Sequence, residues 1–97
     1  MNSEKLKYFG VGTKLYVEYE HDGVIESQKC ILAKTFEDDF LFQVITIEGY
    51  HSGEIEGYIS KQFDKTNIKM RNFCTWDFLQ SELEKKVFPN IKKIEVL

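Results

Sequence analysis

Residue types that commonly do chemistry are concentrated in one short segment, residues 48–58, with the sequence EGYHSGEIEGY. Tyr50, His51 and Ser52 stand side by side there, between glycines. A nucleophile and its base must contact each other, but neighbouring residues of an extended chain point to opposite faces. His51 and Ser52 therefore do not form a catalytic pair, and the turn of a β-hairpin is the better interpretation of this segment.

Other arrangements that carry chemistry are missing from the sequence. It contains no GxSxG elbow, no phosphate-binding loop and no dinucleotide-binding glycine pattern. The two histidines and two cysteines have none of the spacings typical of zinc ligands. An enzyme would have only His21, His51 and Cys74 to use. We therefore expect a protein that is not an enzyme, with no catalytic residue, no metal and no cofactor.

The two cysteines, Cys30 and Cys74, lie in unrelated contexts without a CxxC motif. We expect two reduced, buried thiols, with a disulfide between them as the alternative. The N-terminal residues MNSEKLKYFG lack the apolar core of a signal peptide, and no apolar run is long enough to cross a bilayer. The expected location is the cytoplasm, without membrane contact.

Most of the chain has the patterns of β-strands. Residues 14–20, KLYVEYE, alternate apolar and polar, and the Asp22-Gly23 pair that follows is a strong hairpin signal. A returning strand is expected from Val24. The run at 40–47, FLFQVITI, is apolar on both faces and predicts the central strand. Further strands are expected at 54–60, where Gly57 suggests a bulge or a close approach, and at 66–73.

One helix is expected late in the chain. Thr75 is a suitable N-cap, and Pro89 marks the end. Trp76, Leu79, Leu83 and Val87 fall at helical spacing and give the helix one apolar stripe. A last strand, residues 91–97, closes the chain.

Together these elements predict an α+β protein. Strands followed by a helix favour a curved antiparallel sheet of about five to six strands packed on one C-terminal helix. The pattern leaves open whether the sheet closes into a small barrel. The length of 97 residues, without a linker or low-complexity segment, predicts a single domain over residues 1–97.

Charge is distributed unevenly along the chain. The formal net charge is only −3, yet residues 18–56 hold ten acidic residues against two lysines. In a meander of hairpins, alternate turns lie at the same end of the sheet, so the turn at 21–23 and the loop at 48–53 should share one end. We expect an acidic, tyrosine-bearing rim there, and its partner-binding candidates are Glu18, Glu20, Asp22, Glu48, Tyr50, His51, Glu54 and Glu56.

An acidic rim favours a basic protein partner and repels nucleic acid phosphates. The alternative is that these charges only keep the sheet soluble and its edges unpaired. A small acidic chain with a β-sheet and one helix resembles, in general form, the bacterial immunity proteins of contact-dependent growth inhibition systems. The resemblance implies a toxin domain as the partner, often a nuclease, whose basic active site is blocked by acidic residues in place of phosphate.

A second hypothesis uses the other half of the chain. A small SH3-like or OB-like barrel could bind nucleic acid or peptide through basic residues and the aromatic residues near them. The candidates are Lys61, Lys65, Lys69 and Arg71. The position of the aromatic residues relative to the acidic and basic zones would distinguish the two hypotheses.

Overall fold

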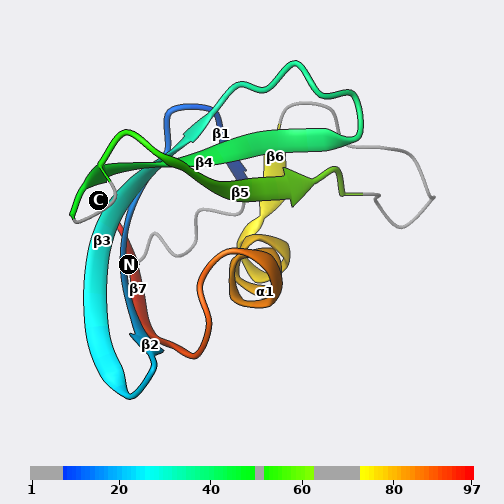
Figure 1. Cartoon of the computed structure of the whole chain (residues 1–97). Helices are drawn as coiled ribbons and strands as arrows, with labels where there is room; N and C mark the ends of the chain where they lie inside the picture. The colour runs from blue at the N-terminus through cyan, green and yellow to red at the C-terminus, as the bar shows by residue number, and fades with distance from the viewer. Residues whose placement is uncertain (1–7, 50–51, 63–72) are drawn as a thin grey trace.

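The protein is an α+β structure, and its described residues form seven strands and one helix near the C-terminus (Figure 1). The computed structural model describes residues 8–49, 52–62 and 73–97. The elements are β1 (Tyr8–Gly10), β2 (Lys14–His21), β3 (Val24–Ala33), β4 (Phe40–Glu48), β5 (Ile55–Ser60), β6 (Phe73–Thr75), α1 (Trp76–Lys86) and β7 (Ile91–Val96). They form a five-stranded antiparallel sheet in the order β5-β4-β3-β2-β7 and a two-stranded sheet of β1 and β6. The predicted fold class is confirmed.

The β2–β3 hairpin forms where the sequence predicts it. Its turn residues, Asp22 and Gly23, have φ angles of 54° and 80°, which suit the right-handed twist of the two strands. Leu15, Val17 and Tyr19 are buried on the concave face of the sheet. The alternating residues between them point to the convex face.

The strand β4 is not central, contrary to the prediction for residues 40–47. The central strand is β3, and β4 lies between β3 and β5. A run of residues that is apolar on both faces predicts that the strand is buried. It does not predict the position of the strand in the sheet. The register of β4 against β3 passes from Glu48 opposite Lys29 to Thr46 opposite Cys30, which leaves Ile47 as the extra residue of a bulge.

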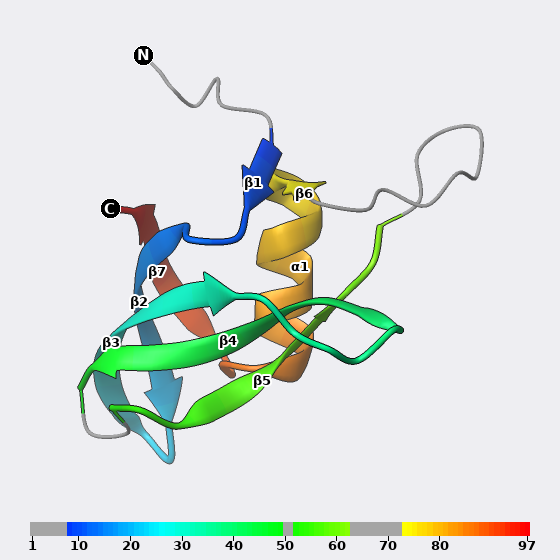
Figure 2. The same ribbon diagram turned by 90° about the horizontal axis from the view of Figure 1, so that it is seen from above.

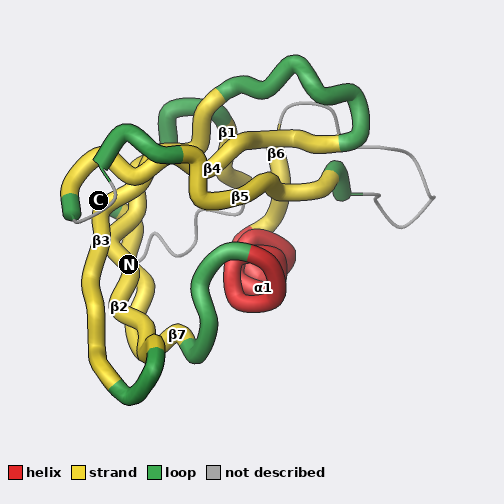
Figure 3. The backbone as a smooth tube through the Cα atoms, viewed as in Figure 1, coloured by secondary structure: helices red, strands yellow, loops and turns green. Residues whose placement is uncertain are grey.

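The sheet curves around α1 without closing into a barrel (Figures 1 and 3). In the described part of the chain, β5 and β7 are its two edges. The helix lies on the concave side, where Leu79 and Leu83 are fully buried with Phe42 and Ile59 in the main core.

The helix begins and ends where the sequence predicts. The Thr75 hydroxyl accepts a hydrogen bond from the Phe78 N–H at 3.3 Å, so it caps the first turn. After the last turn the chain passes close to β5. A Cβ placed on Gly57 would lie 2.9 Å from Val87 Cγ2, so only glycine permits this approach. The close approach predicted at Gly57 is confirmed.

Two short strands extend the structure beyond the main sheet. In their register Phe9 lies opposite Cys74, and both side chains belong to the core. The sequence does not predict β1, which has only three residues and no alternation to read. The strand predicted at 66–73 lies outside the described residues except for Phe73, the first residue of β6.

Candidate functional site

Two connections leave the same end of the five-stranded sheet, the turn between β2 and β3 and the loop between β4 and β5 (Figure 2). Four strands (β2, β3, β4 and β5) and these connections bring acidic residues to that end, which we call the hairpin end. The acidic residues are Glu18, Glu20, Asp22, Glu26, Glu48, Glu54 and Glu56. Two further predicted site residues, Tyr50 and His51, lie outside the described residues.

On the convex face, part of this acidic charge is balanced by lysines. Glu48 lies 3.1 Å from Lys29 Nζ on the neighbouring strand, and Glu20 lies 3.6 Å from Lys92 Nζ. These pairs are exposed, so each contributes little to stability. The convex face is therefore a mixed surface of acids and lysines, less acidic than the sequence alone suggests.

Glu18 is held by a tyrosine of its own strand. The Tyr16 hydroxyl donates a hydrogen bond to the Glu18 carboxylate, and this bond raises the pKa of Tyr16. At the turn, Asp22 has an 87% exposed side chain and lies 3.7 Å from His21 Nε2. These positions place a partly exposed tyrosine and carboxylates together on the convex face and its turn.

A chain of polar side chains crosses the concave face at the hairpin end. The Tyr19 hydroxyl donates to Glu26 at 3.0 Å and accepts from Gln28 Nε2 at 2.6 Å. The Thr46 hydroxyl lies 2.5 Å from Gln28 Oε1 and 3.0 Å from Glu56 Oε2. Tyr19, Gln28 and Thr46 are buried, and the two glutamates end the chain at its partly exposed sides.

This arrangement moves Glu56 from the outer rim to the concave side of the sheet. Its charge also reaches the core. Burial raises the pKa of the Cys30 thiol to about 12, and the charge of Glu56 adds to the effect. Burial likewise raises the pKa of Tyr19, and the hydrogen bond to Glu26 raises it further. Glu56 thus acts on the interior from the concave side.

Sequence reasoning missed this polar chain, although a signal for it exists. Gln28 is in phase with the buried residues Cys30 and Leu32, and Thr46 is in phase with Val44. A polar side chain at a buried position of a strand needs a hydrogen-bond partner. Once β3 and β4 are paired, Gln28 and Thr46 are therefore expected to bond to each other.

The described part of the β4–β5 loop packs against β3. A Cβ on Gly49, whose φ is 136°, would lie 3.2 Å from Gln28 Cγ. The Ser52 hydroxyl donates to the Gly49 carbonyl at 2.8 Å, and the Gly53 N–H donates to the Thr46 carbonyl at 2.6 Å. Ser52 therefore stabilises a turn, in agreement with the interpretation of this segment as a hairpin connection.

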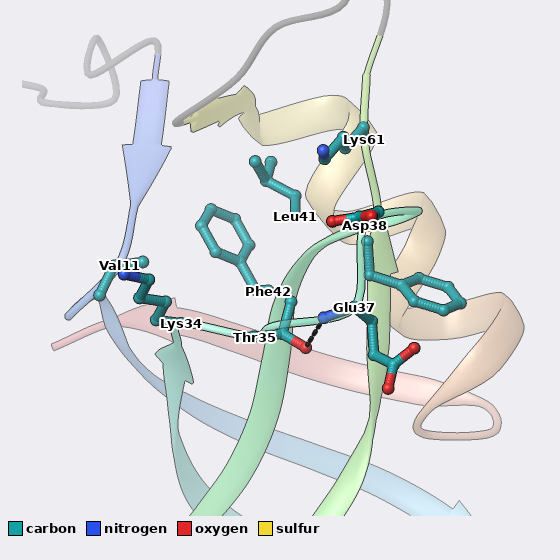
Figure 4. A pocket seen from close by; sticks show the side chains of 9 residues that line it. Val11, Lys34, Thr35, Glu37, Asp38, Leu41, Phe42 and Lys61 are labelled. Carbon is teal, nitrogen blue, oxygen red and sulfur yellow. Dashed lines mark hydrogen bonds between the residues drawn. The ribbon is translucent and has the colours of Figure 1, made fainter.

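The opposite end of the sheet has a cleft of about 450 Å³ (Figure 4). Leu41 and Phe42 form its apolar floor, and Lys34 and Lys61 stand on different walls. The other lining residues are Val11, Thr35, Glu37, Asp38 and Phe40. Sequence reasoning did not find this cleft, because it depends on how the loop after β3 folds over the start of β4. Of the predicted basic residues, Lys65, Lys69 and Arg71 lie outside the described part of the chain.

Both cysteines are free and fully buried, as predicted. Burial raises the pKa of Cys74 to about 12, with a further contribution from the charge of Glu82.

Within the described ranges, no group of three or more histidine, cysteine, aspartate or glutamate residues could hold a metal ion. No helix of the described residues is long and apolar enough to cross a membrane.

Comparisons with known proteins found no matching family model, no matching curated protein and no matching solved structure.

Proposed function

We propose that this protein is a non-enzymatic binding protein that engages a basic partner protein through the hairpin end of its sheet. The observation that carries the proposal is the presence of two connections at one end of the sheet, with acidic residues on both and on the strands beside them. Asp22 lies in the first connection and Glu54 in the second. Such a surface attracts a basic partner and speeds its encounter.

The charge balance at the hairpin end supports this proposal. Lys29 and Lys92 pair with Glu48 and Glu20, and acidic residues remain in excess. Tyr16, beside Glu18, adds a partly exposed aromatic ring of the kind that is enriched at protein interfaces. A partner with clustered lysines or arginines would complement this surface.

A toxin domain is the specific partner that we propose. In this form the protein is a cytoplasmic immunity protein, and its carboxylates occupy the phosphate-binding positions of a basic toxin, such as a nuclease. The mechanism requires only carboxylates at the spacing of phosphates and a surface that fits the toxin. It requires no catalytic residue in this chain.

The test is affinity purification of the tagged full-length protein from its native cell, with identification of the proteins that bind. Two double variants are compared, Glu20→Lys with Glu54→Lys at the hairpin end, and Glu37→Lys with Asp39→Lys in the loop at the opposite end. Both pairs change the charge by the same amount. We expect the hairpin-end variant to weaken partner binding by about tenfold or more, with a larger loss at low salt.

The opposite-end variant should bind like the unchanged protein, and circular dichroism should show both variants folded. Equal loss in both variants would mean that only net charge matters. Retained binding in the hairpin-end variant, or recovery of RNA in place of a basic protein, would exclude the proposal.

A further inference from the structure

Among the described residues, strand β7 is paired along only one of its edges. It pairs with β2 on one side, and no described strand pairs with its other side. Lys92, Lys93 and Glu95 are exposed, and Val96 is 42% exposed. Gln80 and Glu84 of helix α1 and residues 91–94 of β7 line an open pocket of about 240 Å³ between the helix and this strand. Part of this edge can therefore accept another strand.

The backbone direction at this edge follows from one hydrogen bond. The Leu97 N–H donates to the Lys14 carbonyl at 2.9 Å. In an antiparallel pair, backbone groups point alternately toward the partner strand and away from it. Lys93 and Glu95 therefore direct their backbone groups toward β2. Ile94 and Val96 direct theirs to the open edge.

We infer that β7 pairs with β7 of a second copy of this chain, in an antiparallel arrangement with Ile94 on the two-fold axis. Three candidate centres for such a pairing lie near the middle of the strand, at Lys93, Ile94 and Glu95. A centre at Lys93 places two lysines opposite each other, and a centre at Glu95 does the same with two glutamates. A centre at Ile94 places each Lys93 opposite the Glu95 of the other copy, where opposite charges attract.

The Ile94 centre also agrees with the backbone geometry. Ile94 would exchange two hydrogen bonds with its counterpart, because its backbone groups point outward. Lys93 and Glu95 would then face each other as non-hydrogen-bonded pairs, in which the side chains of opposite residues lie closest. Lysines on an edge strand usually discourage pairing. Here Lys93 has a carboxylate, Glu95, two residues away, so self-pairing matches unlike charges at these two positions.

This dimer uses a different surface from the hairpin end. Evidence against the dimer would therefore not count against the proposed function, and the reverse also holds. The pairing of one short strand gives a small interface, so we expect a weak dimer that dissociates on dilution. The test is sedimentation equilibrium of the full chain over about a hundredfold range of concentration. The unchanged protein should shift from monomer to dimer.

Charge variants identify the register. Lys93→Glu alone and Glu95→Lys alone should each remain monomeric, because each places like charges opposite each other. An equal mixture of the two variants should form a heterodimer, because each charged position then faces its opposite. Lys34→Glu, a matched charge reversal in the loop after β3, should dimerise like the unchanged protein.

Hydrogen exchange gives a second readout. The amides of Ile94 and Val96 should become protected as concentration rises, whereas those of Lys93 and Glu95 are protected by β2 at all concentrations. A protein that stays monomeric at the highest concentration overturns the inference. A dimer that survives both single reversals, or a mixture that stays monomeric, overturns it as well.

Discussion

At the scale of single residues, the polar chain from Glu26 to Glu56 has a consequence for stability. The Thr46 hydroxyl has one proton and lies within hydrogen-bond distance of two acceptors, Gln28 Oε1 and Glu56 Oε2. Gln28 in turn donates to Tyr19. Because Thr46 and Gln28 are buried, water cannot easily replace a lost partner, and the loss of one hydroxyl leaves a buried oxygen unsatisfied.

We predict that Thr46→Val lowers the free energy of unfolding by about 1–3 kcal/mol, although valine has nearly the same shape. Thr46→Ser keeps the hydroxyl and should lose only the packing of one methyl group, about 1 kcal/mol. Urea denaturation of both variants measures the difference. Adding Gln28→Leu to Thr46→Val should recover part of the loss, because the unsatisfied amide is removed too. A Thr46→Val protein as stable as the unchanged one would contradict the prediction.

At the scale of elements, side chains of α1 hold the end of β5. The Glu82 carboxylate accepts from the Ser60 N–H at 2.9 Å and from Lys86 Nζ at 2.7 Å. Burial alone raises the pKa of Glu82. The hydrogen bonds from Lys86 and Ser60 outweigh it, so the pKa falls below its ordinary value of 4.5. A carboxylate with a lowered native pKa stabilises the fold above its unfolded-state pKa, and the contribution is lost as pH falls through the native value.

We therefore predict that the unchanged protein exceeds Glu82→Gln in stability by a constant amount above about pH 5, and that the difference shrinks as pH falls below 4.5. Denaturation curves of both proteins from neutral to acidic pH measure it. Lys86→Gln removes one of the hydrogen bonds that lower the pKa, so it should weaken this pH dependence. A difference that grows as pH falls would show the opposite sign and exclude the mechanism.

The elements also show how far the sequence could predict the structure. The β2–β3 hairpin and α1 were predictable, because alternation, the Asp22-Gly23 turn and the Thr75 cap are local signals. The place of β4 in the sheet was not predictable, because position depends on pairing with distant strands.

The inward position of Glu56 follows from a register shift: Ile45 lies opposite Ile55, and Val44 lies opposite Gly57. The two-residue step on β5 against one on β4 reverses the alternation, so Ile55 is 52% exposed while Ile59 is buried.

At the scale of the whole molecule, one core joins both sheets and the helix. Cys30 belongs to the five-stranded sheet and Cys74 to β6, and both are fully buried in the same cluster. Burial raises the pKa of both thiols to about 12, so neither has an appreciable thiolate fraction in the folded protein at neutral pH.

We predict that both thiols resist a thiol-specific reagent in the native protein and react only when the chain unfolds as a unit. In Cys30→Ala and Cys74→Ala, the single remaining thiol should react at a rate set by global unfolding, once the rate is corrected for each variant's stability. Labelling followed by mass spectrometry over a denaturant series measures both rates. Faster labelling of Cys74 without denaturant would show that β1 and β6 open separately from the main sheet.

The two edges of the main sheet are not alike. At β5, Val87 packs closely on Gly57, and the Ser60 N–H is already bound by Glu82. At β7, the outward backbone groups of Ile94 and Val96 have no described strand beside them. A sheet that can add strands at only one edge cannot propagate into a fibril, because each addition uses up the single reactive side. If copies of this chain associate through β7 alone, growth terminates at two.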